Sequence, residues 1–199
     1  AGGVSGGLWV NNDITDANAS WTRVSGIPEN ISASSITVDP NNSQIFYVGT
    51  GETYVGGDVT GNGIWKTVDG GTTWTHSFGG STGVTTFGST SGQTFVPGQY
   101  NVNDVKAWNN GGSTVIFAAV GANSFGFTGV DPTFIGAFQY GLYKSTDNGA
   151  NWSLVSNDIS GNPYEVNDIE IAADNSIWVA TKGNVFGSGG GTILQSIDG

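Results

Sequence analysis

Residues 67–74 of this chain read TVDGGTTW, and residues 145–152 read STDNGANW. Both follow the pattern [S/T]-x-D-x-G-x-x-W, and the last residues, SIDG at 196–199, begin the same pattern again. A degenerate copy lies near the N-terminus, where Asp13 is followed by Trp21 after a longer spacing. A signature that recurs at intervals of tens of residues predicts a repeat architecture, in which each copy belongs to one supersecondary unit.

The residue types of the signature predict a structural role. Its aspartate can accept hydrogen bonds from backbone N–H groups of its own turn. Its glycine allows a positive φ, and its tryptophan can supply buried area between sheets. We expect these roles, rather than catalysis by paired carboxylates, for Asp69, Gly71, Trp74, Asp147, Gly149, Trp152 and Asp198.

Four short strand patterns accompany each copy of the signature. A first strand alternates apolar and polar residues, which predicts half burial, and a second is nearly continuous in apolar residues, which predicts full burial. A third strand ends in the signature, and a fourth begins at its tryptophan. The first strands are predicted at 35–39, 104–108 and 168–172, the second at 45–49, 115–119 and 176–180, and the third at 7–10, 63–66, 141–144 and 192–195.

Four antiparallel strands repeated radially describe the blade of an all-β fold, the β-propeller. Residues 1–24 then hold the third and fourth strands of one blade, 31–78 and 102–156 are complete blades, and 166–199 form an incomplete blade. Joining the two ends would give only about three blades, below the usual minimum of roughly four. Residues 1–199 are therefore predicted to be a partial β-propeller, about three blades of a larger one; the alternative is an open arc that needs a neighbour.

The composition excludes several classes of partner. The formal net charge is −11 with only five Lys and Arg residues, which argues against nucleic acid and against anionic membrane surfaces. No apolar run approaches the roughly 20 residues of a membrane span, so no membrane insertion is expected. Aromatic residues make up 12% of the chain, too many for a disordered segment. The chain starts at Ala1 and contains no Met, which fits a piece of a longer protein.

The long loops of the predicted blades all fall on one face, opposite the signature turns. They are the connections from second to third strand and the crossovers between blades, and long loops on a rigid scaffold often form a binding surface. Aromatic rings beside Asn, Asp and Gly suit sugar binding; alternatively, the Phe residues fold back into small cores under the loops. The candidate ligand-binding residues are Tyr54, Tyr100, Phe127, Phe134, Tyr140 and Tyr164.

Three carboxylates are candidate catalytic groups. Asp104 and Asp168 each follow Val-Asn at the start of a first strand, a point near the axis of a propeller, and Glu52 begins a long loop. Such carboxylates could bind a cation or act as acid and base. The interpretation we favour is that Asp104 and Asp168 tie down the preceding crossover through backbone N–H groups.

One segment resembles the first half of a calcium loop. Asp58, Thr60 and Asn62 stand at alternate positions before Gly63, as the first ligands of such a loop do. Its twelfth position would fall on Asp69, which the signature already uses. The alternative is a plain polar loop, and no cofactor other than calcium is indicated.

The signature resembles the Asp-box, or BNR repeat, of sialidases, sortilin-type propellers, xyloglucanase-type glycoside hydrolases and photosystem assembly propellers. Residues 38–52 and 63–66 look especially like those of large secreted bacterial proteins of this class. The resemblance implies a propeller fold and an extracellular or cell-surface location. It does not imply one function, because the same box occurs on enzymes, receptors and assembly factors.

Two functions remain open on this basis, beside a purely structural spacer. The first is a secreted or cell-surface module that binds a glycan or a protein through the long-loop face, with the remaining blades of the same protein as neighbours. The alternative is a xyloglucanase-like glycoside hydrolase whose paired carboxylates are completed by residues outside this chain. Sialidase activity is disfavoured, because it needs an arginine cluster and the chain has only Arg23.

Overall fold

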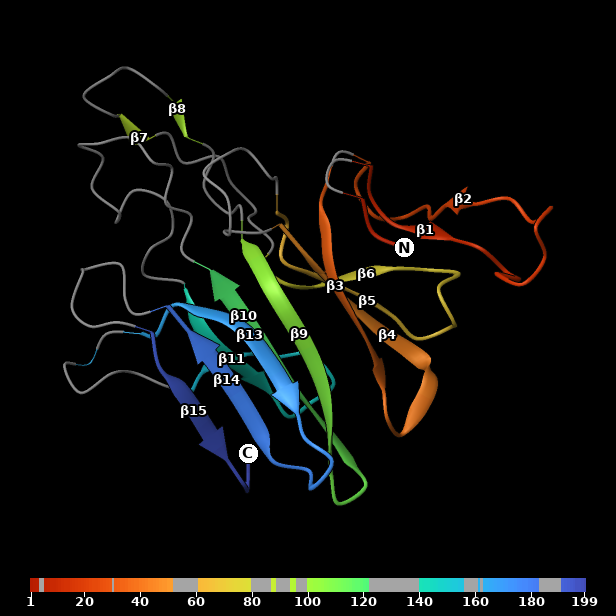
Figure 1. Cartoon of the computed structure of the whole chain (residues 1–199). Helices are drawn as coiled ribbons and strands as arrows, with labels where there is room; N and C mark the ends of the chain where they lie inside the picture. The colour runs from red at the N-terminus through yellow and green to blue at the C-terminus, as the bar shows by residue number, and fades with distance from the viewer. Residues whose placement is uncertain are drawn as a thin grey trace.

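The computed structural model describes residues 1–3, 6–29, 31–51, 61–79, 87–88, 94–95, 100–121, 140–155, 161, 163–182 and 191–199. Within these residues the regular structure is β-strand, and the strand pairs are antiparallel (Figure 1). This confirms the predicted all-β class. No helix long and apolar enough to cross a membrane occurs in the part of the chain that the structure describes.

Three sheets repeat along the chain, and we call them sheets 1, 2 and 3. Sheet 1 contains β3 (Ala33–Asp39), β4 (Asn42–Thr50), β5 (Ile64–Thr67) and β6 (Thr75–Phe78). Sheet 2 contains β9 (Asn101–Asn110), β10 (Ser113–Gly121), β11 (Gly141–Ser145) and β12 (Ser153–Leu154). Sheet 3 contains β13 (Val166–Ile171), β14 (Ile177–Thr181) and β15 (Ile193–Ser196). In each sheet the strands are hydrogen-bonded in sequence order, as the four-strand repeat predicts.

Two strand pairs lie outside these sheets. β1 (Trp9–Val10) pairs with β2 (Thr22–Arg23) near the N-terminus, where the degenerate signature predicts a third and a fourth strand. β7 (Phe87–Gly88) pairs with β8 (Thr94–Phe95) in a stretch that the sequence indicates as a loop.

The registers show that the sheets are copies of one another. In sheet 1, Tyr47 pairs with Thr37 on one side and Lys66 on the other. In sheet 2, Phe117 pairs with Lys106 and Lys144, and in sheet 3, Trp178 pairs with Glu170 and Gln195. The residues Tyr47, Phe117 and Trp178 therefore occupy the same position in successive sheets.

The three sheets stack, with their first strands β3, β9 and β13 side by side and β9 in the middle (Figure 1). We call the face that each sheet turns toward the next one its leading face, and the opposite face its trailing face. Between sheets 1 and 2 a core cluster includes Tyr47, Ile64, Val105 and Ile116. Between sheets 2 and 3 another cluster forms; it contains Trp108, Val115, Phe117, Ala119, Leu142, Val166, Ile169, Ile177 and Val179.

A third cluster joins the N-terminal segment to the trailing face of sheet 1. Leu8, Ile27 and Ile31 pack with Val48 of β4. Leu8 stands just before β1, Ile64 begins β5 and Leu142 lies in β11, so the three residues hold similar places in the repeat. The contact of Leu8 with sheet 1 therefore repeats the packing between the other sheets.

The burial of β9 differs from its prediction. The alternating sequence of 104–108 predicts half burial, but Asn101–Trp108 of β9 are buried except for the partly exposed Lys106. The reason is that sheet 2 has a neighbour on both faces, so the polar positions of β9 meet another sheet instead of solvent. β3, in the first sheet, shows the expected alternation between exposed and partly buried residues.

Candidate functional site

The first signature forms a turn closed by its own side chains. The Asp69 carboxylate accepts hydrogen bonds from the Thr73 backbone N–H (2.8 Å) and from the Thr67 and Thr73 hydroxyls (2.7 and 2.6 Å). The Thr67 hydroxyl accepts a bond from the Gly71 N–H (3.0 Å), and the Trp74 ring N–H donates to the Gly71 carbonyl (3.0 Å). Each polar residue of the pattern thus has a partner within the turn.

The second signature repeats the same contacts. Asp147 accepts bonds from the Asn151 backbone N–H (2.8 Å), the Asn151 side chain (2.7 Å) and the Ser145 hydroxyl (2.9 Å). The Gly149 N–H donates to Ser145, and the Trp152 ring N–H donates to the Gly149 carbonyl. These hydrogen bonds hold the pKa of Asp147 at about 2, and that of Asp69 is lowered in the same way. Both aspartates are therefore ionised structural groups at neutral pH.

The expected backbone of the signature is also present. Gly71 has a φ of 95° and Gly149 a φ of 80°, the left-handed region in which glycine is favoured. The start of the third copy is similar, because the Ser196 hydroxyl donates to Asp198 (3.1 Å).

Two lysines each bind the signature of the following sheet. The Lys66 ammonium donates to the carbonyl of Asn148, and the Lys144 ammonium donates to the carbonyl of Gly199, the residue after Asp198. Lys66 and Lys144 occupy equivalent positions, because each directly precedes the first residue of a signature. Their recurrence at one position was the available signal, and sequence reasoning did not assign them a role.

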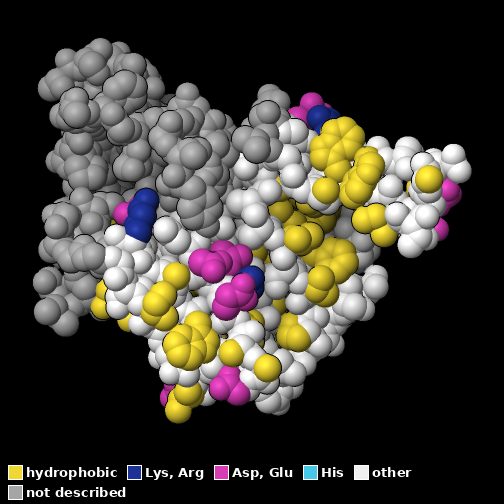
Figure 2. Space-filling model, viewed as in Figure 1, with side chains coloured by type: hydrophobic (Ala, Val, Ile, Leu, Met, Phe, Trp, Pro, Cys, Tyr) yellow, Lys and Arg dark blue, Asp and Glu magenta, His cyan; other side chains and the backbone are white. Residues whose placement is uncertain are grey.

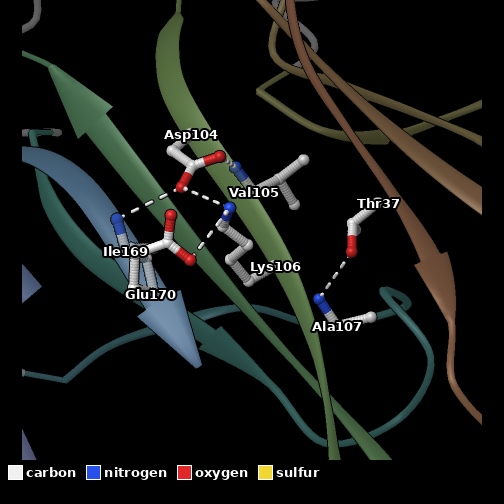
Figure 3. A network of polar contacts seen from close by, with 7 residues as sticks. All are labelled: Thr37, Asp104, Val105, Lys106, Ala107, Ile169 and Glu170. Atoms are coloured by element: carbon white, nitrogen blue, oxygen red, sulfur yellow. Dashed lines mark hydrogen bonds and ion pairs between the residues drawn. The ribbon is translucent and has the colours of Figure 1, made fainter. Parts of the chain in front are cut away.

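Asp104 lies at the contact between sheets 2 and 3 (Figure 3). Its carboxylate accepts hydrogen bonds from the N–H of Val105 (2.9 Å) and from the N–H of Ile169 in β13 (3.1 Å). The Lys106 ammonium lies 3.6 Å from Asp104 and 3.7 Å from Glu170. Asp104 therefore binds the backbone of the neighbouring sheet, whereas the prediction placed its partners in the preceding crossover.

Burial controls the protonation of this carboxyl. Asp104 is only 7% exposed, and this burial raises its pKa to about 6 against the opposing effects of Lys106 and the Ile169 N–H. The charge of Asp168 raises the pKa of Asp104 further. Asp168 itself is exposed on the leading face of sheet 3. The remaining candidate, Glu52, lies outside the described residues.

The raised pKa makes stability depend on pH. The folded-state pKa of Asp104 is about 6 against an ordinary value of 3.8 for aspartate, so the native state binds more protons between these values. Stability should therefore fall as pH rises from about 4 to 6, by roughly 2–3 kcal/mol for a shift of about two units. Urea unfolding at several pH values measures this fall.

Two variants test the assignment to Asp104. Asp104→Asn should lose the fall between pH 4 and 6, while it lowers stability overall because one backbone N–H loses its acceptor. Asp168→Asn should keep the fall. An unchanged slope in Asp104→Asn would show that another group is responsible.

The candidate aromatic residues divide into three groups. Tyr140 is 1% exposed, so its ring is not available for stacking on a ligand, contrary to the prediction. Tyr100 and Tyr164 are partly buried; Tyr100 meets Phe78 edge-on at 5.4 Å, and Tyr164 packs against the cluster between sheets 2 and 3. Tyr54, Phe127 and Phe134 lie outside the described residues.

The calcium loop is not supported in its twelve-residue form. Asn62 precedes β5 and Asp69 follows it, so the intervening strand places these two residues at opposite ends. The Asn62 N–H donates to Thr50, and its carbonyl lies 2.6 Å from the His76 ring nitrogen. Asp58 and Thr60 lie outside the described residues; among those described, no three His, Asp or Glu side chains group as metal ligands.

Comparisons with known proteins give limited information. No family model matches the chain, and no curated protein matches it. Among solved structures, it is similar to a GH74 enzyme from Niastella koreensis, with 29% identity and a TM-score of 0.46 over 80% of this chain and 19% of that one. It is also similar to the GH74 xyloglucanase from Xanthomonas campestris, with 14% identity and a TM-score of 0.49 over 89% of this chain and 23% of that one.

A further similar structure is PorZ, described as an essential surface component of the type-IX secretion system of Porphyromonas gingivalis. The identity is 15% and the TM-score 0.48, over 94% of this chain and 23% of that one. The chain thus spans about a fifth of the length of these three structures. These identities, TM-scores and coverages do not assign a function to the chain.

Proposed function

We propose that this chain is part of an Asp-box β-propeller of an extracellular or cell-surface protein, and that it binds a glycan or a protein through one end of its sheets. The observation that carries this proposal is the repeated stacking. Sheets with the same strand order and register pack with their first strands adjacent, as blades do around a propeller axis. The location follows from the resemblance of the signature.

The binding end is the one opposite the signature turns. The segments 52–60, 122–139 and 183–190 each connect a second strand to a third strand, and 80–99 connects sheet 1 to sheet 2. The registers bring the strand ends that flank these segments to one edge, since Gly49 pairs with Ile64 and Ile64 with Phe78. Such a concentration of long connections at one end of a rigid scaffold favours binding.

Glycoside hydrolysis is the second candidate, and one observation favours it. A buried carboxyl whose pKa is raised to about 6, in part by the charge of a second carboxylate, has the protonation expected of a general acid. Against this, both oxygens of Asp104 accept backbone hydrogen bonds, and the side chain is covered by sheet 3. We therefore favour binding, with Asp168 and Glu52 as the carboxylates to test for catalysis.

A glycan array tests the binding function, with xyloglucan oligosaccharides included. Tyr54→Ala should weaken binding by about 3- to 10-fold, the loss expected for one stacking ring. The control is Asn110→Ala, an exposed residue at the end of β9 on the signature side, which should not change binding.

The same samples test hydrolysis. Release of reducing ends by the unmodified chain, abolished in Asp168→Asn or Glu52→Gln, would favour the enzyme and contradict a purely binding role. Equal binding by Tyr54→Ala and the unmodified chain would remove Tyr54 from the proposed surface.

A further inference from the structure

Three Asn–Gly dipeptides occur in this chain, and they begin at Asn62, Asn110 and Asn148. Such a dipeptide is chemically reactive, because the backbone nitrogen of the glycine can attack the carboxamide carbon of the asparagine side chain. Glycine has no Cβ atom to hinder this approach. The attack needs a free glycine N–H and rotation of the peptide unit that joins the two residues. The folded structure therefore decides which of the three sites can react.

At two of the sites the glycine N–H already has a partner. The Gly63 N–H donates to the Tyr100 carbonyl (2.9 Å), and Gly63 is buried. The Gly149 N–H donates to the Ser145 hydroxyl (2.8 Å), and Gly149 is also buried. Rotation of either peptide unit would leave a buried backbone group without a partner, which is costly.

The carbonyls of the same two peptide units are also held. The Asn62 carbonyl lies 2.6 Å from the His76 ring nitrogen. The Asn148 carbonyl accepts a hydrogen bond from the Lys66 ammonium (2.8 Å). Because the carbonyl and the N–H of each unit both have partners, each unit can rotate only after the fold opens locally.

The third site lies at the connection between β9 and β10. This connection projects from the lower end of the molecule in Figure 1, and the surface there is mostly white in Figure 2, the colour of backbone and of uncharged polar side chains. Asn110, Gly111 and Gly112 are all exposed. The Gly111 N–H donates no hydrogen bond to any residue that the structure describes.

Little holds the peptide unit between Asn110 and Gly111. Asn110 pairs with Ser113 in the last pair of the hairpin, and terminal pairs open most easily. The Gly112 N–H donates to the Asn109 side chain (2.8 Å), a bond that leaves the Gly111 N–H free. Gly111 and Gly112 have φ values of 61° and 96°, as in two-residue hairpin turns, and glycine can leave these angles without a steric penalty.

We propose that Asn110 is a site of spontaneous deamidation in the folded chain, whereas Asn62 and Asn148 are protected. The Gly111 nitrogen loses its proton to solvent base and attacks the side-chain carbonyl carbon of Asn110. A carbon–nitrogen bond forms and the side-chain nitrogen leaves as ammonia, which gives a cyclic imide. Water then opens the imide at either of its carbonyls. One opening gives aspartate, and the other gives isoaspartate, in which the backbone runs through the side-chain carbon.

The modification would change a turn that adjoins sheet 3. It adds one negative charge at Asn110, and isoaspartate also adds a methylene group to the backbone at the end of β9. The neighbouring Asn109 carbonyl accepts a hydrogen bond from the Asn175 side chain (3.2 Å), and the Trp108 ring N–H donates to the Asn175 carbonyl (3.0 Å). This turn lies at the signature end of the sheets, so the loop end and its ligand are not involved.

Ageing of the full chain at mildly alkaline pH tests the proposal, because base speeds loss of the N–H proton. Peptide mapping by mass spectrometry measures, at each site, the mass increase that accompanies replacement of the amide by a carboxylate. In the folded chain Asn110 should react at least about tenfold faster than Asn62 or Asn148. Anion-exchange chromatography should resolve a form with one extra negative charge, and this form should carry the modification at Asn110.

Two controls separate the effect of the fold from that of the dipeptide itself. In concentrated urea the three sites should react at rates within about threefold of one another, because unfolding frees each glycine N–H. Gly111→Ala should slow the reaction at Asn110 at least about tenfold, since a Cβ atom hinders the attack. Nothing lies within 4 Å of the added atom, so the fold should tolerate this change at an exposed turn. Asn110→Gln, whose longer side chain closes a ring slowly, should remove the more negative form.

Three outcomes would overturn the proposal. The first is equal reaction of Asn110 and Asn148 in the folded chain, which would show that the signature turn opens as easily as the hairpin end. The second is reaction of Asn110 only in urea, which would show that the β9–β10 turn is held rigid. The third is reaction at Asn110 no faster than at Asn109, which is not followed by glycine.

Discussion

Phe117→Ala is expected to lower the free energy of unfolding by about 3–5 kcal/mol, the usual cost of removing a buried aromatic ring. Phe117 is 2% exposed and belongs to the cluster that joins sheets 2 and 3. Its ring centroid lies 6.3 Å from that of Trp108 and 5.7 Å from the Lys144 ammonium. The substitution would therefore leave a cavity at the contact between two sheets and remove a cation–π contact.

Trp178→Ala is the matched control for this prediction. Trp178 occupies the same repeat position in sheet 3, but it is 40% exposed, because no described strand packs on that leading face. Its substitution should cost less than about 1 kcal/mol. Urea unfolding followed by far-UV circular dichroism measures both values. Comparable losses in the two variants would show that the leading face of sheet 3 is covered in solution.

The repeat itself could be predicted from the sequence because its determinants are local. The signature contains the donors and acceptors that close its turn, as the contacts of Asp69 and Asp147 show. The strand order follows the order of the patterned segments along the chain, and both four-stranded sheets have it. Such features depend on residues within a few positions of one another.

The contacts between sheets could not be predicted in the same way. The alternation in β9 indicates one solvent-facing side, yet Asp104 and Lys106 both face sheet 3. Their partners in that sheet, Ile169 and Glu170, stand 65 and 64 residues later in the chain. The burial of Tyr140 was missed for a similar reason, since a tyrosine at a loop end looks the same in sequence whether exposed or packed. Spacing along one repeat does not record which side chains of the next repeat lie opposite.

The candidate site was predicted only in outline. The sequence placed Asp104 and Asp168 at equivalent positions, and the structure agrees, since Asp104 pairs with Ala119 and Asp168 with Ala180. Their environments differ because sheet 3 covers Asp104, and in the described residues no sheet covers Asp168. Equivalent positions in a stack therefore differ in accessibility because of their neighbours and not because of their own sequence.

Gly149→Ala is expected to cost about 3 kcal/mol or more, because the substitution meets two separate penalties. Gly149 has a φ of 80°, where a side chain adds about 1–2 kcal/mol of backbone strain. A Cβ atom there would also lie 2.5 Å from the Ser77 hydroxyl and 3.3 Å from the Tyr47 ring of sheet 1. Ser77 can move away only by giving up its 2.7 Å hydrogen bond to the Gly149 carbonyl.

Two variants separate these penalties. Gly112→Ala has a comparable φ of 96° with nothing within 4 Å of the added atom, so it should show the backbone strain alone, about 1–2 kcal/mol. Ser77→Gly combined with Gly149→Ala should recover part of the loss, which a double-mutant cycle by urea unfolding measures as a coupling energy. A coupling near zero, with Gly149→Ala no worse than Gly112→Ala, would mean that the second signature does not press against sheet 1. Coupling of about 1 kcal/mol or more would show that the signature turn serves the contact between sheets as well as its own blade.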